Sequence, residues 1–336
     1  MQYFSIQVEI RRKNCYNCRM KQFISHQSAL EYWRRCRELP EGSDNRRRKD
    51  TLPEKTSKIE LSALLGFIMP VHILARKQGD QRIPDIVTQH VFRGETPAGC
   101  FMNAGNGLMA SSPEFCFLQM AGQLTLVKLI ELGYELCGVY SLPNACDENV
   151  PERGFYNRQP LTSIKKLKAF LDSMPGVKGR KKAMRALRYL RDGSASPMET
   201  KLAIVLILPY MLGGYGFCLP EMNKRIDIPK ASREFFSKDY YVCDLFWPDE
   251  KIAVEYDSDQ QHTGSNRIAN DSIRRNALGM EGIRVVSVTK PQLYDSTGLE
   301  GVARTIAGYM GRRLFSKKSD FPDRHYELRK QLLRGS

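Results

Sequence analysis

The sequence lacks any hydrophobic stretch long enough to span a lipid bilayer, which takes about 20 apolar residues. Its most apolar segment, Leu202 to Leu212, is short and contains Pro209, so we expect a buried helix and its exit. The first residues, Met1 to Phe4, lack the basic and then apolar layout of a secretory signal. These absences exclude integral-membrane and secreted proteins and predict an intracellular, cytoplasmic protein without a membrane partner.

The nine cysteines show no pairing pattern, and their number is odd. Three of them stand singly among apolar residues, as reduced core cysteines do: Cys116, Cys137 and Cys243. Cys15 and Cys18 have the spacing of zinc ligands, and His26 and Cys36 follow in the sequence. The second half of the usual zinc pattern is missing. Reduced cysteines are therefore the expected state, and a zinc site is the alternative.

Acidic residues are scarce, with 37 Asp and Glu against 52 Lys and Arg and a formal net charge of +15. This balance predicts salt-sensitive binding to a polyanion. Part of the excess lies on a predicted helix from Gly179 to Arg191, where Lys181, Arg185 and Arg188 form a basic stripe. The buried stripe of that helix should hold Met184, Leu187 and Leu190. The basic stripe is either a solubilising face or a contact with a DNA backbone.

Two β-rich runs, Tyr240 to Trp247 and Ile252 to Asp257, are joined by a four-residue polar turn. A turn of this length predicts a hairpin, so the two runs should pair in one sheet. Alternation then places Glu255 and Asp257 on one face of the second strand. We therefore expect Asp244, on the first strand, to meet Glu255 across the pair.

A buried cluster of carboxylates is unfavourable unless a cation neutralises it, and hard oxygen ligands suit Mg²⁺ or Mn²⁺. Such a cation commonly serves phosphodiester hydrolysis. Asp244 and Glu255 are therefore predicted metal ligands, with a structural ion-pair network as the alternative. Asp257 either joins this site or caps the end of its strand.

A predicted helix precedes the hairpin. Ser196 is its expected N-cap, and an apolar stretch follows from Pro197 to about Leu208. Glu199, in the first turn, either faces the carboxylates or only complements the helix dipole. Between this helix and the hairpin we expect one weak strand, near Arg225 to Ile228.

A second predicted helix, from about Arg267 to Met280, follows the hairpin and precedes a strand from Ile283 to Thr289. On this helix Asp271, Arg274 and Arg275 share one polar face. The two arginines either pair with Asp271 or contact nucleic-acid phosphates.

The order of these pieces resembles the restriction-endonuclease-like superfamily, and within it the branch related to very-short-patch-repair endonucleases. The pieces are Asp244, Glu255-Tyr256-Asp257, His262, Asp271 to Arg275, and Gly282 to Val286. The resemblance covers roughly residues 195 to 295 and implies an αβββαβ core, a mixed sheet flanked by helices. By this resemblance Asp244 and Glu255 hold magnesium, Glu199 and Asp257 support them, and His262 activates water or contacts phosphate.

The chain departs from that family pattern at three positions. Asp257 stands where the superfamily often has Lys, although this branch commonly has an acid there. Ser258 and Gln261 stand where Gly and His are usual. An intact fold with weakened catalysis is therefore the alternative.

In the N-terminal part, Ser28 to Glu31 has the spacing of a capping box and predicts the start of a helix. Strands are expected at Met69 to Ala75 and Asp85 to Phe92, and Ser112 should cap a helix from Phe115 to about Leu126. These segments resemble the antitoxin half of abortive-infection toxin–antitoxin pairs. That resemblance implies an α+β domain that binds a protein partner or DNA in a prokaryotic defence or regulatory setting. The histidines of this part, His26, His72 and His90, share no spacing and are expected to be ordinary strand and loop residues.

The predicted protein is thus of the α/β class and has four segments. They are an antitoxin-like α+β domain (1–140), a linker with a basic helix (141–192), a nuclease domain (193–310) and a basic C-terminal helix or tail (311–336). The predicted function is a metal-dependent DNA endonuclease. The alternatives are a non-catalytic DNA-binding regulator that keeps the nuclease fold, and an RNA-cleaving enzyme with the same metal site.

Overall fold

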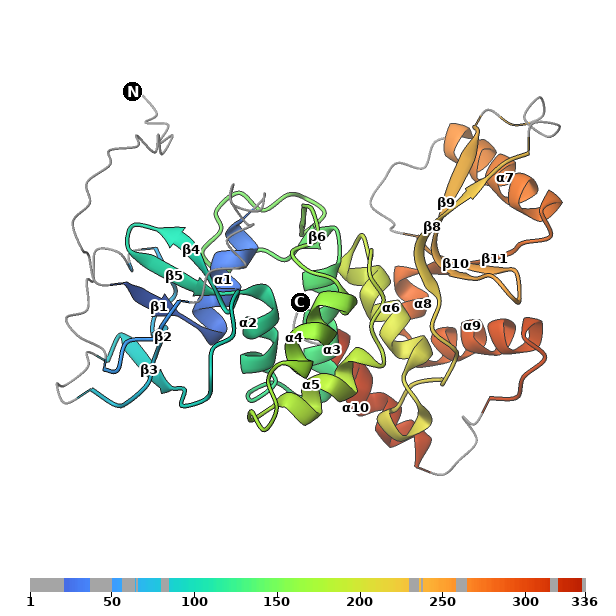
Figure 1. Cartoon of the computed structure of the whole chain (residues 1–336). Coiled ribbons are helices and arrows are strands. Elements are labelled where there is room, and N and C mark those ends of the chain that lie inside the picture. Colours follow the sequence, from blue (N-terminus) through green and yellow to red (C-terminus); the bar gives the residue numbers. More distant parts are fainter. Residues whose placement is uncertain are drawn as a thin grey trace, which may run out of the picture.

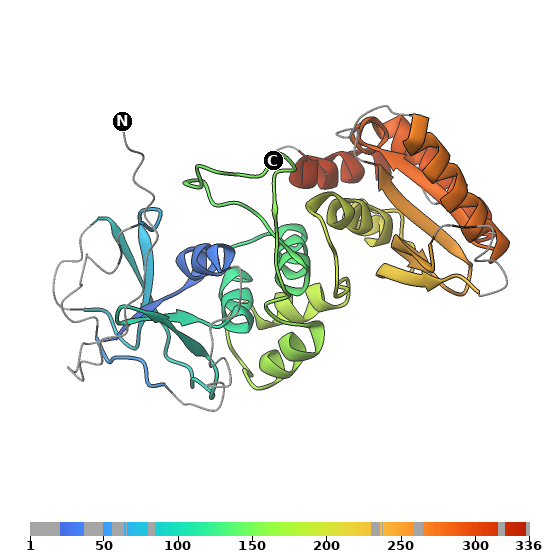
Figure 2. The same cartoon turned by 90° about the horizontal axis from the view of Figure 1, so that it is seen from above.

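The computed structural model describes residues 21–36, 50–55, 64, 66–79, 85–229, 236, 238–257, 265–314 and 320–333. For residues 265–269 it describes the backbone alone. Two sheets lie at opposite ends of the molecule with helices between them (Figures 1 and 2). The predicted mixed α/β class is confirmed. Cys15, Cys18 and His262 lie outside the described residues.

The N-terminal sheet has the strand order β3-β2-β1-β5-β4. Its strands are β1 (Gln22–Ile24), β2 (Val71–Ala75), β3 (Val87–Val91), β4 (Phe101–Gly105) and β5 (Leu108–Ser111). The predicted strands around residues 69–75 and 85–92 are therefore present as β2 and β3, which pair in parallel.

The first helix, α1 (His26–Arg35), begins before the predicted capping box. Ser25 is its N-cap, and Ser28 lies inside the helix, where its Oγ accepts a hydrogen bond from the backbone N–H of His72 (2.9 Å). Glu31 likewise accepts from the backbone N–H of Ile68 (3.1 Å). The capping-box prediction is wrong because Ser28 and Glu31 lie inside the helix and accept from backbone N–H groups of residues 72 and 68; Glu31 also pairs with Arg35 of its own helix.

The three N-terminal histidines lie together. In the parallel register His72 faces Thr88, and His90 stands two positions further along β3, on the same face of the sheet. Nδ1 of His72 lies 2.8 Å from Nε2 of His90, and the ring of His26 stacks on that of His90 with centroids 3.7 Å apart. His72 and His90 are strand residues, as predicted, but the clustering of the three histidines was not predicted from their spacing.

The middle of the molecule is helical. It contains α2 (Pro113–Met120), α3 (Leu126–Cys137), α4 (Ile164–Asp172), α5 (Arg180–Leu187) and, from the end of the described chain, α10 (Phe321–Leu333); a short ribbon of β6 (Tyr140–Ser141) and β7 (Tyr156–Asn157) adjoins them. Ser112 caps α2 as predicted, accepting from the N–H of Phe115 (3.2 Å). The helix ends at Met120 and not at Leu126, because Thr125 caps the next helix.

A largely buried ion pair joins α1 to the helical layer. Arg34 donates two hydrogen bonds to the carboxylate of Glu135 on α3, at 2.8 and 2.7 Å. The backbone oxygen of Glu135 accepts from Arg158 (2.8 Å), a buried side chain that also reaches the backbone oxygen of Trp33 (3.1 Å). The N-terminal sheet is thus held to the helices partly by charge.

The C-terminal sheet has the order β11-β10-β9-β8, with β10 and β11 parallel and the other pairs antiparallel. Its elements follow the chain as α6 (Pro197–Ile207), a 3₁₀ turn η3 (Tyr210–Leu212), β8 (Glu221–Asp227), β9 (Tyr240–Trp247), β10 (Ile252–Asp257), α7 (Ser265–Met280), β11 (Arg284–Thr289), α8 (Lys290–Tyr294) and α9 (Ser296–Tyr309). The hairpin, the two helices around it and the last strand are confirmed. The weak strand near residue 225 begins earlier than predicted, at Glu221.

The two faces of this sheet bury different partners. Val254 of β10 belongs to the main core together with the apolar residues of α6. Its neighbour Ala253 packs with Ala277 and Leu278 of α7 in a second core. The alternation predicted for β10 therefore directs successive side chains to opposite helices.

Helix α10 returns to the middle of the molecule, where it contacts α3, α6 and η3. Gly213, after η3, has φ +85°, and a Cβ there would overlap the backbone oxygen of Arg324. Thr125 donates to the side-chain oxygen of Gln331 (2.7 Å). Among the helices in the described part of the chain, none is both apolar and long enough to cross a membrane.

Candidate nuclease site

Glu199 is a buried carboxylate at the start of α6. The Oγ of Ser196 accepts a hydrogen bond from the backbone N–H of Glu199 (3.1 Å), which places this residue in the first turn as predicted. The side chain is turned back to accept from the N–H of Ala195 (3.1 Å) and from the amide of Asn223 (2.7 Å). Burial raises the pKa of Glu199, and these hydrogen bonds oppose the rise.

Asn223 is a site residue that the sequence did not reveal. It lies on β8 opposite Asp244, between the pairs Met222 with Leu245 and Lys224 with Cys243. Its φ of +48° is in the left-handed region, which Asn tolerates better than most residues. Only the strand register and this backbone turn bring its amide to Glu199, and a sequence pattern predicts neither.

Asp244 occupies the centre of the arrangement, on β9. Its Oδ2 accepts a hydrogen bond from the backbone N–H of Tyr256 (2.8 Å), at the point where the β9–β10 ladder ends. Burial first, and then the negative charge of Glu199, raise the pKa of Asp244 to about 7. The charge of Glu255 acts in the same direction. Asp244 is therefore close enough to the carboxyl groups of Glu199 and Glu255 for their charges to act on it.

Glu255 is paired with a cation from α7. Arg274 donates to Oε1 of Glu255 (2.5 Å) and also to the backbone oxygen of Val242. The Glu255 side chain is 17% exposed; burial raises its pKa and Arg274 opposes that rise. From the sequence, Arg274 was predicted either to pair with Asp271 or to contact phosphates. Its ion pair with Glu255 is a third role.

A polar hollow of about 320 Å³ opens at these carboxylates. The sequence-predicted residues that line it are Asp244, Glu255, Asp257, Asp271, Arg274 and Arg275. The structure thus brings together the hairpin acids and both arginines of α7. Glu199 meets Asp244 from the α6 side and does not line this hollow.

The donor set suits a hard divalent cation in part. Within the described residues, no three His, Cys, Asp or Glu side chains converge closely enough to hold a metal ion. Asp244 and Glu255 alone fit Mg²⁺, which keeps several waters and is commonly held by one or two carboxylates and substrate phosphates.

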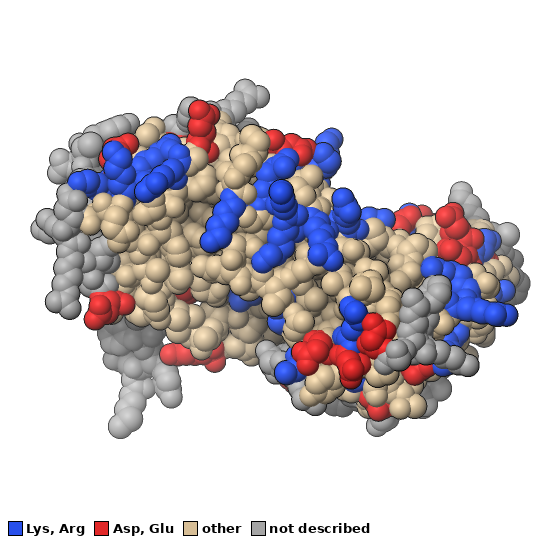
Figure 3. All heavy atoms as spheres, turned by 90° about the horizontal axis from the view of Figure 1, so that it is seen from below, with Lys and Arg blue, Asp and Glu red and all other residues tan. Residues whose placement is uncertain are grey.

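A basic groove lies on the helical layer, apart from the carboxylates. It has a volume of about 640 Å³ and is lined by Lys168, Arg180, Lys181, Arg185 and Arg188 together with the apolar residues Ile164, Met184 and Leu187. Lys and Arg side chains gather over the middle of this face (Figure 3).

The basic stripe of α5 is therefore exposed, as predicted. The prediction of its buried stripe is partly wrong. Ala183, Ala186 and Leu190 are buried, while Met184 and Leu187 are half-buried and border the groove.

No family model, no curated protein and no solved structure matches this chain.

Proposed function

We propose that this chain is a nuclease that hydrolyses DNA phosphodiester bonds with Mg²⁺ or Mn²⁺ bound at Asp244 and Glu255. One observation carries the proposal: Asp244 and Glu255 line one polar hollow from neighbouring strands, and the charges of Glu255 and of Glu199, on α6, both repel that of Asp244. Such repulsion is costly in a folded protein, and a bound cation removes it.

The arrangement of elements supports the same proposal. The chain order α6, β8, β9, β10, α7, β11 and the parallel pairing of β10 with β11 fit the αβββαβ core of the restriction-endonuclease-like superfamily. The acids lie on its central hairpin and first helix, where the resemblance expects them. The antitoxin-like assignment of the N-terminal part stays a prediction.

Each residue of the site then has a distinct role. The cation would orient the scissile phosphate, lower the pKa of the attacking water and neutralise developing charge. Asp244, held by the N–H of Tyr256, and Glu255 are the residues that would bind it. Asn223 fixes Glu199 beside Asp244, and Asp257 and Arg275 line the opening.

The substrate would be held mainly by charge. Lys181, Arg185 and Arg188 form no ion pair within the described residues, so their charges are available to phosphates. With a net charge of +15, association should be fast and sensitive to salt.

The second candidate is a DNA-binding regulator without catalysis. The ion pair between Arg274 and Glu255 favours it, because a guanidinium already neutralises one of the two proposed ligands. In that case the polar hollow is a structural ion-pair network, and DNA binding persists without cleavage.

The deciding experiment incubates the purified protein with supercoiled plasmid, single-stranded DNA and structured RNA, each with Mg²⁺, with Mn²⁺ or with chelator. Asp244→Asn and Glu255→Gln preserve size and remove the charges. Asp249→Asn, in the exposed turn of the same hairpin, is the matched control.

Metal-dependent cutting that the two site variants lose and Asp249→Asn keeps would support the nuclease. Cutting of RNA alone would transfer the proposal to an RNA-cleaving enzyme. Binding without cutting in either metal would support the regulator.

A further inference from the structure

A third pocket, of about 550 Å³, lies between the N-terminal sheet and the helical layer, far along the chain from the carboxylates. His26 and His90 line one side of it. His26 is the first residue of α1 and has φ +49°, a left-handed conformation that costs about 1 kcal/mol or more for a residue other than Gly. Such strain persists only where surrounding contacts impose it.

Three contacts impose the position of His26. Its backbone N–H donates to Oε1 of Gln119 (3.0 Å), and its Nδ1 lies 3.0 Å from Oγ of Ser25. Its ring stacks on that of His90, which is in turn hydrogen-bonded to His72. The imidazole edges are therefore held rigidly at the pocket wall.

The histidines present hydrogen-bonding edges without charge. Burial first, and then the neighbouring histidines, lower the pKa of His26 to about 3, and burial followed by His72 lowers that of His90 to about 4. Both rings are therefore neutral near pH 7, and each offers one N–H donor and one nitrogen acceptor, shared among their present contacts.

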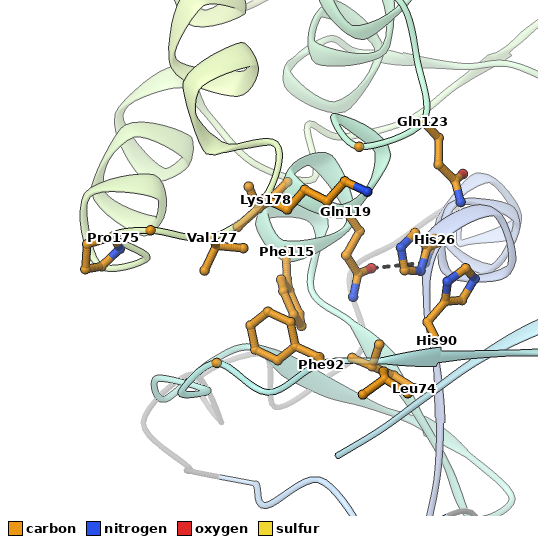
Figure 4. A pocket seen from close by; sticks show the side chains of 15 residues that line it. His26, Leu74, His90, Phe92, Phe115, Gln119, Gln123, Pro175, Val177 and Lys178 are labelled. Atoms are coloured by element: carbon orange, nitrogen blue, oxygen red, sulfur yellow. Dashed lines mark hydrogen bonds between the residues drawn. The ribbon is translucent and has the colours of Figure 1, made fainter. Parts of the chain in front are cut away.

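The pocket has one polar and one apolar side. In Figure 4 the side chains of Gln119, Gln123 and Lys178 extend toward the two imidazoles, and the half-buried ring of Phe92 forms the opposite wall, with the buried Phe115 behind it. These two rings meet edge to face, with centroids 5.2 Å apart. Among the described residues that line the pocket, Lys178 is the only Lys or Arg, and none is Asp or Glu.

We propose that this pocket binds a flat heteroaromatic ligand with an anionic group, of the class of nucleoside monophosphates. The ring of Phe92 suits the face of a ring, and the exposed amide of Gln123 and the neutral imidazoles suit the mixed donors and acceptors on its edge; the amide of Gln119 is already bonded to His26 and Ser111. Lys178 suits a phosphate as a point charge. The volume is within the range of small-molecule sites. This ligand goes beyond the proposed nuclease function and does not depend on it.

The test measures binding of AMP, GMP, CMP and UMP to the full chain by calorimetry, with EDTA present so that no cation at Asp244 and Glu255 contributes. Adenosine, guanosine, cytidine, uridine and inorganic phosphate are measured alongside. We expect at least one monophosphate to bind with a Kd below about 1 mM, and its nucleoside and phosphate alone each to bind at least about tenfold more weakly.

Two exposed positions in the pocket allow mild variants. Lys178→Met should weaken the monophosphate about tenfold and leave the nucleoside unchanged, because only the phosphate loses a partner. Gln123→Ala should weaken both about equally. Lys290→Met, at an exposed lysine of α8 outside the pocket, should change neither.

The proposal is overturned if no monophosphate binds more tightly than about 1 mM, the limit set above. It is equally overturned if Lys178→Met and Gln123→Ala both leave the affinity unchanged, since the ligand would then be bound elsewhere. Neither result bears on cleavage by the carboxylate site, so failure here is distinguishable from failure of the nuclease proposal.

Discussion

Arg274 on α7 donates a hydrogen bond to Oε1 of Glu255 on β10, so the candidate metal ligand already has a cationic partner. The guanidinium also holds the backbone oxygen of Val242 on β9 and thereby connects the helix to two neighbouring strands. A divalent cation at Glu255 would compete with this contact. If the cation displaces Arg274 from Glu255, the proposed nuclease can bind its metal there. If Arg274 keeps Glu255, the proposed metal site is inactive.

Arg274→Gln should increase the stabilising effect of Mg²⁺. Without Arg274 the pKa of Glu255 should rise further and the protein should unfold at a lower temperature, because a buried carboxylate has lost its partner. A bound cation then replaces the lost charge. We expect saturating Mg²⁺ to raise the Tm of Arg274→Gln more than that of the wild type, measured by differential scanning calorimetry. Arg275→Gln, in the same hollow, is the control, and equal shifts in all three proteins would contradict metal binding at Glu255.

Asp244→Asn should make the protein more stable above pH 7 and flatten its dependence on pH. The pKa of Asp244 is about 7 when folded, above its ordinary value, so between about pH 4 and 7 the folded state binds more protons than the unfolded state. Stability contributed by the neutral carboxyl group is therefore lost as the pH rises through the pKa that Asp244 has in the folded state. The gain at pH 8 should be on the order of 1–2 kcal/mol in chelator, measured by urea unfolding. Asp249→Asn should show no such gain, and an Asp244→Asn curve parallel to that of the wild type would refute the raised pKa.

Charge removal from the basic groove should weaken nucleic-acid binding without unfolding the protein. The triple variant Lys181→Gln, Arg185→Gln, Arg188→Gln should lower the slope of log affinity against log salt by roughly 2–3, as expected for three lost phosphate contacts. A second triple variant, with Gln at the exposed residues Arg93, Lys290 and Arg313, loses the same net charge outside the groove and is the control. Equal losses in the two triple variants, measured by fluorescence anisotropy, would mean that the groove is only a solvated face.

Glu135→Gln should destabilise the protein by about 2–3 kcal/mol, because the largely buried Arg34 would lose its full counter-charge. Glu327→Gln, on α10, removes a carboxylate whose partner Lys330 is 54% exposed, and should cost less than about 1 kcal/mol. Guanidinium unfolding at pH 7 measures both. A loss for Glu135→Gln no larger than that for Glu327→Gln would show that the ion pair does not hold α1 to α3.

Local patterns predicted the C-terminal half better than the N-terminal half, for a physical reason. The hairpin from Tyr240 to Asp257 is specified by its own turn and alternation, and α6 by the cap at Ser196. Both signals act over a few residues. The capping box at Ser28 failed because its hydroxyl bonds to His72, which is 44 residues away.

Contacts that depend on the register between paired strands could not be predicted from the sequence. Asn223 reaches Glu199 only because β8 pairs with β9 in one particular alignment. His72 and His90 meet through the parallel register of β2 and β3, and His26 joins them through the packing of α1. The acids themselves were predictable as residue types, but their shared electrostatics, shown by the pKa of Asp244, needed the folded geometry.

The position of α10 has a consequence for the order in which the chain folds. Thr125 and Gln331 are 206 residues apart in sequence, yet their side chains are hydrogen-bonded. Contacts of such separation form slowly, because a long loop must close before they yield any stabilisation. On a ribosome, α3 and η3 would therefore emerge long before α10 could cover them. Until then their apolar surfaces would be open to chaperones.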